Sequence, residues 1–193
     1  MSHVGKVILI GASAGGVDAI QSILTHFQLE AEGCPFVLVL HIPDNFRIRA
    51  DLVFSIPKGY FIKEAGDKEP ILSRHIYLAP GGYHLLIESD RTFALSRDEP
   101  VQQCRPSIDV LFESAAVLGP DAVALLLTGA NADGAEGLKA LKDSNAYTLV
   151  QDPEEAEMSA MPLAAISLFK PDYVGTIANL SAELNRVLLQ EAT

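Results

Sequence analysis

Residues 6–20, KVILIGASAGGVDAI, decide the fold of this chain. The apolar run that ends at Ile10 is too short for a helix of its own, so it predicts a fully buried strand. Small residues then interrupt the run, and apolar residues return at the three-to-four spacing of one helix face, at Val17, Ile20, Leu24 and Phe27. Strand, tight turn and helix place the turn at the carboxyl edge of a parallel sheet, where open α/β folds bind their ligands.

Ser13 is the only side chain in this turn that can take part in covalent chemistry. Gly11 and Gly15 flank it as G-x-S-x-G, so the chain can bend sharply and a substrate can approach the backbone. The amides and positive dipole end of the following helix could stabilise an oxyanion. The turn alone is compatible with a nucleophilic serine and with a structural or ligand-cradling loop.

Three other interpretations of the turn fail on sequence. A dinucleotide fingerprint needs G-x-G-x-x-G and a later acidic residue at a strand end, and neither is present. A phosphate-binding loop needs Gly-Lys-Ser/Thr, whereas Val17 follows Gly16. A short-chain dehydrogenase needs a tyrosine four residues before a lysine, and none of the five tyrosines has one.

The composition predicts one globular domain over residues 1–193, with 49% hydrophobic and 20% charged residues. No apolar run approaches the roughly 18 residues of a membrane span, and no signal peptide is recognisable, so we expect a cytoplasmic protein. Cys34 and Cys104 stand far apart without a C-x-x-C motif, so we expect neither a disulfide framework nor a zinc site. The net charge of −11 argues against non-specific nucleic-acid binding.

Positive charge gathers in one segment, which holds six of the fourteen cations: Arg47, Arg49, Lys58, Lys63, Lys68 and Arg74. The segment is either a solvated face or a docking patch for an acidic partner.

Two later buried strands carry polar residues at their carboxyl ends. His41 follows residues 35–40, and Asp133 lies in the small-residue turn after residues 122–128. Because parallel strands end at one edge of the sheet, we expect both side chains near Ser13. Asp133 is either a structural residue that stabilises the turn or caps the next helix, or the carboxylate that orients a catalytic histidine. His84 also lies at the end of a loop, and it is the alternative to His41 as the catalytic base.

Strands and helices alternate along the rest of the chain. A helix opens at residues 105–109, where Ser107 is a plausible N-cap and Asp109 a structural residue that complements the helix dipole. We expect a small antiparallel hairpin within residues 76–97, and a loop with a short helix over the site at residues 44–58. The predicted fold is a doubly wound α/β domain with a mostly parallel sheet of about seven strands and helices on both faces.

Ser13, His41 and Asp133 are the nucleophile, base and orienting acid of an acyl-transfer triad. Their order along the chain differs from the Ser, acid, His order of α/β-hydrolases, so that fold is excluded despite G-x-S-x-G.

With these residues in place, the chain resembles the catalytic domain of the CheB-type chemotaxis protein-glutamate methylesterases over almost its whole length. The resemblance lies in seven groups of residues in matching order: Ile10-Gly11-Ala12-Ser13 with Gly15-Gly16, His41-Ile42-Pro43, Lys63-Glu64-Ala65, Ala79-Pro80-Gly81 with His84, 105-RPSIDVLF-112, Leu127-Thr128-Gly129 with Asp133-Gly134-Ala135, and Met161-Pro162 with Ala165-Ile166.

The resemblance implies that Ser13, His41 and Asp133 are the triad, and it gives His84 a structural or loop role. It implies hydrolysis of glutamate methyl esters on chemoreceptor helices, with glutamine deamidation as a second activity. Backbone amides near Ala14 and Ala130 would receive the oxyanion. No metal or cofactor is expected.

Several residues depart from the family pattern. Ala14 and Ala130-Asn131 stand where the family usually has Thr and Met-Gly, and residues 47–54 replace its Phe-Ala-x-Arg-Leu segment. These departures leave two alternatives, a CheB-like scaffold or sensor with little or no activity, and an esterase for another ester. Full-length enzymes of this type are regulated by an amino-terminal receiver domain, and the given sequence shows none before residue 6. We therefore expect either a stand-alone protein, which lacks this regulation or receives it from a separate receiver domain, or a piece of a longer chain.

Overall fold

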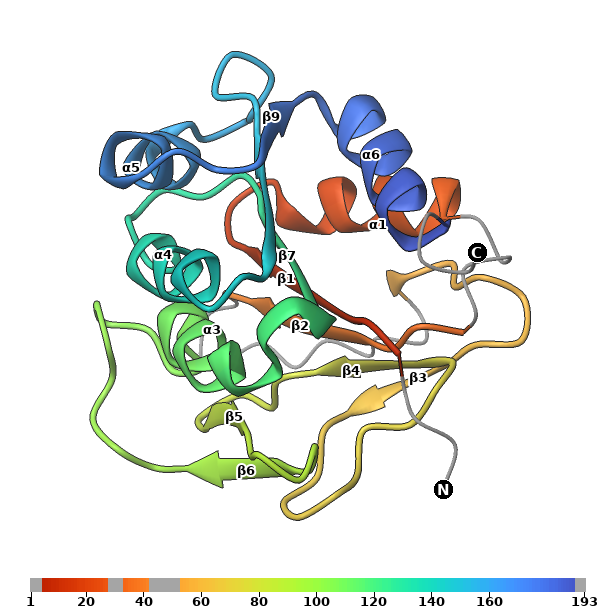
Figure 1. Cartoon of the computed structure of the whole chain (residues 1–193). Coiled ribbons are helices and arrows are strands. Elements are labelled where there is room, and N and C mark those ends of the chain that lie inside the picture. The colour runs from red at the N-terminus through yellow and green to blue at the C-terminus, as the bar shows by residue number, and fades with distance from the viewer. Residues whose placement is uncertain (1–4, 28–32, 42–52, 190–193) are drawn as a thin grey trace.

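The computed structural model of the chain describes residues 5–27, 33–41 and 53–189. A parallel sheet of seven strands forms its centre, in the order β3-β4-β2-β1-β7-β8-β9 (Figure 1). The bounds of these strands are β1 Val7–Ala12, β2 Phe36–Leu40, β3 Phe61–Glu64, β4 His75–Leu78, β7 Ala122–Leu126, β8 Tyr147–Gln151 and β9 Tyr173–Gly175. The predicted fold class is confirmed, and every strand pair described in this sheet is parallel.

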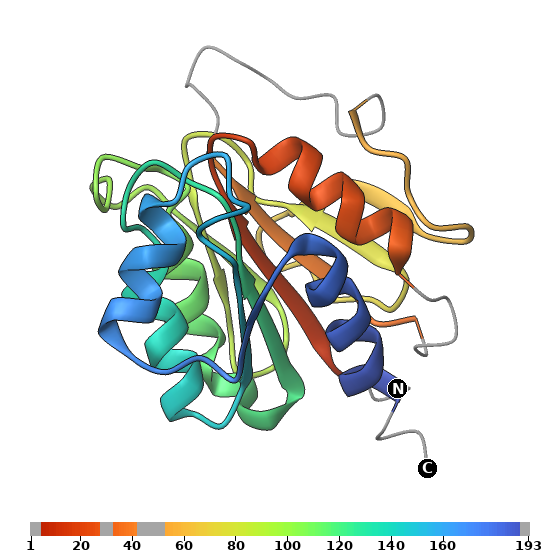
Figure 2. The same ribbon diagram turned by 90° about the horizontal axis from the view of Figure 1, so that it is seen from above.

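Helices cover both faces of the sheet (Figure 2). One layer holds α1 (Gly16–His26) and α6 (Ile177–Leu189), and the other holds α3 (Ile108–Ala115), α4 (Ala135–Asp143) and α5 (Ala160–Leu168). Strand β1 explains why the apolar run is continuous, since Ile8 and Ile10 pack into the core under α1 and α6 while Val7 and Leu9 pack into the core under the other layer.

Two smaller features complete the fold. The antiparallel hairpin expected over residues 76–97 is shorter than predicted: β5 (His84–Ile87) pairs with β6 (Phe93–Ser96), whereas residues 76–78 belong to β4 and are parallel to β2 and β3. Helix α3, whose start the sequence predicted, passes after Ala115 into the 3₁₀ helix η1 (Ala116–Asp121), in which Gly119 has a non-helical backbone. None of the described helices is long and apolar enough to cross a membrane. Most of the loop expected at residues 44–58 lies outside the described residues.

Candidate active site

Three strand ends meet at the carboxyl edge of the sheet. Strand β1 lies between β2 and β7, and the register pairs Ala12 with Leu40 and Gly11 with Leu126. The hydrogen bonds continue one residue further, since the His41 amide donates to the carbonyl of Ala12 at 3.0 Å and the Ser13 amide donates to the carbonyl of Thr128 at 2.9 Å. Ser13 therefore follows the middle strand of the three.

The turn that carries Ser13 is held from two sides. Gly15 adopts φ = 76° at the N-cap of α1, a left-handed conformation that favours glycine, and the Gly16 amide donates to the carbonyl of Ser13 at 2.8 Å. Just beyond the end of β7, the hydroxyl of Thr128 donates to the carbonyl of Ala14 and accepts from the amide of Met158, both at 2.9 Å. The turn is thus tied to the loop before α5.

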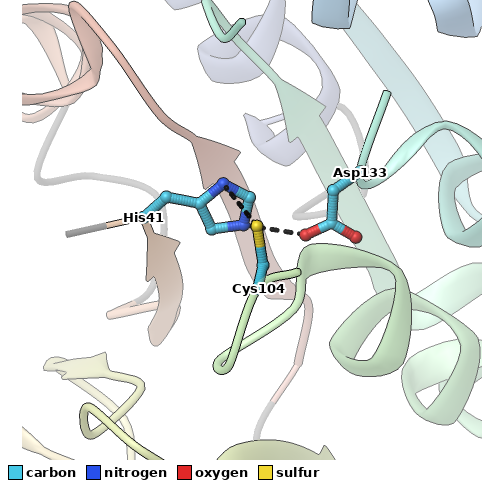
Figure 3. A group of neighbouring side chains, drawn as sticks. All are labelled: His41, Cys104 and Asp133. Carbon is cyan, nitrogen blue, oxygen red and sulfur yellow. Dashed lines mark hydrogen bonds and ion pairs between the residues drawn. The ribbon is translucent and has the colours of Figure 1, made fainter. Parts of the chain in front are cut away.

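His41 and Asp133 form a hydrogen-bonded pair. The distance from His41 Nε2 to Asp133 Oδ2 is 2.8 Å, and the side chains are 11% and 0% exposed (Figure 3). A carboxylate oxygen accepts, so Nε2 carries the proton and Nδ1 keeps the lone pair that a general base needs. This arrangement fits the role of Asp133 as the residue that orients His41.

Asp133 is also bonded to the first turn of α3. Its carboxylate accepts from the Ser107 hydroxyl at 2.7 Å, from the Ile108 amide at 2.7 Å and from the Asp109 amide at 3.1 Å. Burial acts to raise the pKa of Asp133, but the bonds from His41, from Ile108 and from Ser107 outweigh burial and lower the pKa below its usual value. Asp133 is therefore held as an anion.

Asp109 mirrors this arrangement on the neighbouring helix. One oxygen of its carboxylate accepts from the amides of Gly134 and Gly137 at 2.9 and 2.8 Å, at the start of α4, and the other accepts from Gln102 at 3.0 Å. Asp133, just before α4, therefore caps the amides at the start of α3, and Asp109 on α3 caps the amides at the start of α4. The sequence predicted only that Asp109 complements the dipole of its own helix. Burial, together with the nearby charge of Asp133, raises the pKa of Asp109 to about 6.

Cys104 lies against the other ring nitrogen of His41. Its Sγ is 3.6 Å from His41 Nδ1 (Figure 3). The side-chain Nδ2 of Asn131 donates to the same sulfur at 3.3 Å. Among the residues that the structure describes, no hydrogen bond joins the Ser13 hydroxyl to His41. The cysteine spacing did not predict that Cys104 lies beside His41, and the available signal was its position just ahead of the Arg105-Pro106-Ser107 motif.

His84 does not compete for the role of base. It is buried at the start of β5, its Nδ1 accepts from the Ser107 amide at 3.3 Å, and its Nε2 faces the carbonyl of Glu99 at 3.1 Å. Nε2 therefore contacts the segment that follows β6, and Nδ1 contacts the start of α3. Ser107 acts there as the expected N-cap, accepting from the Val110 amide at 3.4 Å.

The two amides expected to receive an oxyanion lie on exposed turn residues. Within the described ranges, no acceptor takes the amide of Ala14 or that of Ala130, so both are compatible with that role. Of the cation-rich segment, Arg47 and Arg49 lie outside the described residues, and Lys63 forms an ion pair with Glu69 at 2.7 Å.

A doubly wound α/β domain with a hydrogen-bonded His–Asp pair and a serine turn at one sheet edge has the layout expected of a serine hydrolase. Residues 8–184 match the model of the CheB methylesterase family, and the chain belongs to that family. A relative from Leptospira interrogans is 43% identical over 182 residues, which are 91% of each chain.

Two longer relatives, both named protein-glutamate methylesterase/protein-glutamine glutaminase, come from Hydrogenovibrio crunogenus and Nitrosomonas europaea. They are 36% and 38% identical over 93% of this chain, which spans about half of their length (48% and 51%). The crystal structure of the Thermotoga maritima CheB methylesterase catalytic domain superposes with a TM-score of 0.84 at 26% identity, covering 95% of this chain and 98% of that one. These comparisons confirm the resemblance to the CheB-type methylesterases that the sequence motifs indicated.

Proposed function

We propose that this protein is a carboxylic ester hydrolase that removes methyl groups from glutamate side chains of chemoreceptors. Ser13 is the nucleophile, His41 the base and Asp133 the orienting acid. The observation that carries the proposal is the 2.8 Å bond between His41 and a carboxylate that is held ionised and fully buried, one strand away from the serine turn. The activities in the names of the relatives support the choice of substrate.

The proton relay runs through Nδ1 of His41, since Asp133 occupies Nε2. The Ser13 hydroxyl must come within hydrogen-bond distance of Nδ1 and take the place of the Cys104 thiol there. Such bonds are often long before substrate binds and tighten in the complex.

The chemistry then takes two steps. As the Ser13 oxygen attacks the ester carbonyl, its proton moves to His41, and the amides of Ala14 and Ala130 donate to the oxyanion. His41 returns the proton to the methoxy oxygen and methanol leaves. Water then attacks the acyl-enzyme in the same way and releases the glutamate carboxyl. For a glutamine side chain the leaving group is ammonia, which gives the deamidase activity.

The partners follow from the same assignment. The substrate is the cytoplasmic helices of a methyl-accepting chemoreceptor, so the protein acts in the cytoplasm. Control by a separate receiver domain in trans is part of the proposal, because this chain matches about half of the longer relatives.

The test is methanol release from methyl-labelled receptor. Ser13→Ala should reduce release by about 10⁴-fold or more. Ser167→Ala, which alters an exposed serine on α5, is the matched control and should keep wild-type release. Undiminished release by Ser13→Ala would contradict the assignment of the nucleophile.

The second candidate is a scaffold or sensor domain without hydrolase activity. It is favoured by the missing hydrogen bond between Ser13 and His41 in the described residues. A fluorophosphonate probe separates the two functions, because an unactivated serine does not react. Stoichiometric labelling at Ser13 would exclude the scaffold, and an unlabelled, folded protein would favour it.

A further inference from the structure

Three potential metal ligands converge at His41. His41, Cys104 and Asp133 each place a ligand atom within 4.8 Å of the other two (Figure 3). They come from distant parts of the chain, namely the end of β2, the segment before α3 and the turn before α4. Cys104 has no role in the relay proposed above, which makes its position beside the base a feature that needs its own explanation.

We propose that His41 and Cys104 bind a thiophilic divalent cation of the Zn²⁺ class, which switches the site off. In tetrahedral zinc sites the bonds are about 2.0–2.1 Å to a histidine nitrogen and about 2.3 Å to a cysteine sulfur, so the two ligand atoms lie about 3.5 Å apart. His41 Nδ1 and Cys104 Sγ are 3.6 Å apart. A cation can therefore bind to both atoms with little movement of either side chain.

The neighbours of His41 favour this cation, whereas burial and the charge of Asp133 raise the pKa of the Cys104 thiol, so the cation has to displace the thiol proton. Asp133 accepts from His41 Nε2, which fixes the ring and leaves the lone pair on Nδ1, as in the carboxylate–histidine–zinc arrangement of many metal sites. Asn131 donates from Nδ2 to Cys104 Sγ at 3.3 Å and can stabilise a sulfur that has lost its proton. A soft thiolate with an imidazole selects zinc over magnesium or calcium.

Binding is a balanced exchange of a proton for a metal ion. The thiol proton of Cys104 leaves to solvent, Sγ and Nδ1 each bind the cation, and water fills the remaining positions. The cation then occupies the lone pair that would accept the Ser13 proton. This inhibition rests on the proposed function, whereas the binding itself does not.

Binding is tested with Co²⁺ on the reduced, chelator-treated protein of residues 1–193. We expect one equivalent to produce a sulfur-to-cobalt charge-transfer band in the near ultraviolet and Zn²⁺ to remove the band by competition. Cys104→Ala should abolish the band and weaken Zn²⁺ binding at least tenfold, and His41→Ala should weaken it similarly. Cys34→Ala, which alters the other, buried cysteine, should keep both.

The outcomes are decisive. A wild-type protein without the band, or a band that persists in Cys104→Ala, overturns the site. If Cys104→Ala is shown by circular dichroism not to fold, Cys104→Ser preserves the size of the side chain and should also lose the sulfur band.

The inhibition has its own measurement. Zn²⁺ should suppress methanol release of the wild type with the same midpoint as its binding, and a chelator should restore release. Cys104→Ala, compared with its own metal-free rate, should need at least tenfold more Zn²⁺. Stoichiometric cobalt binding in a protein that releases no methanol would contradict the proposed function and leave the metal site standing. Full activity with Zn²⁺ bound would overturn the inhibition.

Discussion

The two halves of the candidate site differ in how firmly they are built. Asp133 is fully buried and accepts hydrogen bonds from His41 and from the first turn of α3, whereas the Ser13 turn is only partly buried and Ala14 beside it is exposed. The His41–Asp133 half, which must keep a negative charge and a fixed histidine tautomer, is held by several hydrogen bonds. The Ser13 half, which must contact the substrate, is open to solvent. A nucleophile can be moved by its substrate, but a base in the wrong tautomer cannot be corrected at the moment of reaction.

The largest expected effect comes from breaking the rigid half. Asp133→Asn keeps the shape of the side chain but turns an amide group toward His41, which favours the tautomer with the proton on Nδ1. We expect kcat to fall by about 10⁴-fold, as for this change in other triads. The measurement is the rate of methanol release. A loss of less than about tenfold would mean that Asp133 does not orient the base.

The next largest effect concerns the capping of α4 by Asp109. Asp109→Ala leaves the buried amides of Gly134 and Gly137 without their acceptor, so the free energy of unfolding should fall by about 1–3 kcal/mol. Denaturant unfolding measures this change. Asp109→Asn is the matched control, because its carbonyl oxygen still accepts from both amides. Equal losses in the two variants would show that the cap is not responsible.

The raised pKa of Asp109 predicts a pH dependence. Its pKa is about 6 in the folded protein and near its ordinary value of 3.8 in the unfolded chain, so the folded state holds more protons between these values. The free energy of unfolding therefore falls as pH rises through this window, by about 2 kcal/mol from this group.

Asp109→Asn should remove that component, so the wild-type and variant stability curves should diverge between pH 4 and pH 6. Asp133 and Asp172, whose pKa values are lowered, lose their contributions as pH falls below their usual range, and they do so in both proteins. Parallel curves would contradict the raised pKa.

The smallest expected effect concerns Thr128, which holds the turn that carries Ser13. Thr128→Val removes the hydroxyl that joins the carbonyl of Ala14 to the amide of Met158, so the unfolding free energy should fall by about 1–2 kcal/mol. Activity should fall as well, because the turn that carries Ser13 loses its anchor. Thr128→Ser keeps the hydroxyl and should retain most of both. If valine and serine variants behave alike, the hydroxyl does not hold the turn.

Some parts of the site could be predicted from the sequence and others could not. Ser13, His41 and Asp133 each follow a buried apolar run, and parallel strands bring their carboxyl ends together whatever the details of packing. His84 also follows a strand region, and the residues alone left it as a rival until the resemblance, and then its bonds to backbone, assigned it elsewhere. Residues 47–52, which were expected near the substrate, lie outside the described residues.

The sequence by itself determined the layered α/β fold and the edge of the sheet at which chemistry can occur, because the periods of apolar residues fix strands and helices locally. Only the tertiary structure decided which nitrogen of His41 faces Asp133, that Cys104 lies on the other nitrogen, and that Asp109 and Asp133 cap each other's helices. These contacts join residues distant along the chain through side-chain directions. Such directions depend on how α3, α4 and the segment before α3 pack together, and no local pattern encodes that packing.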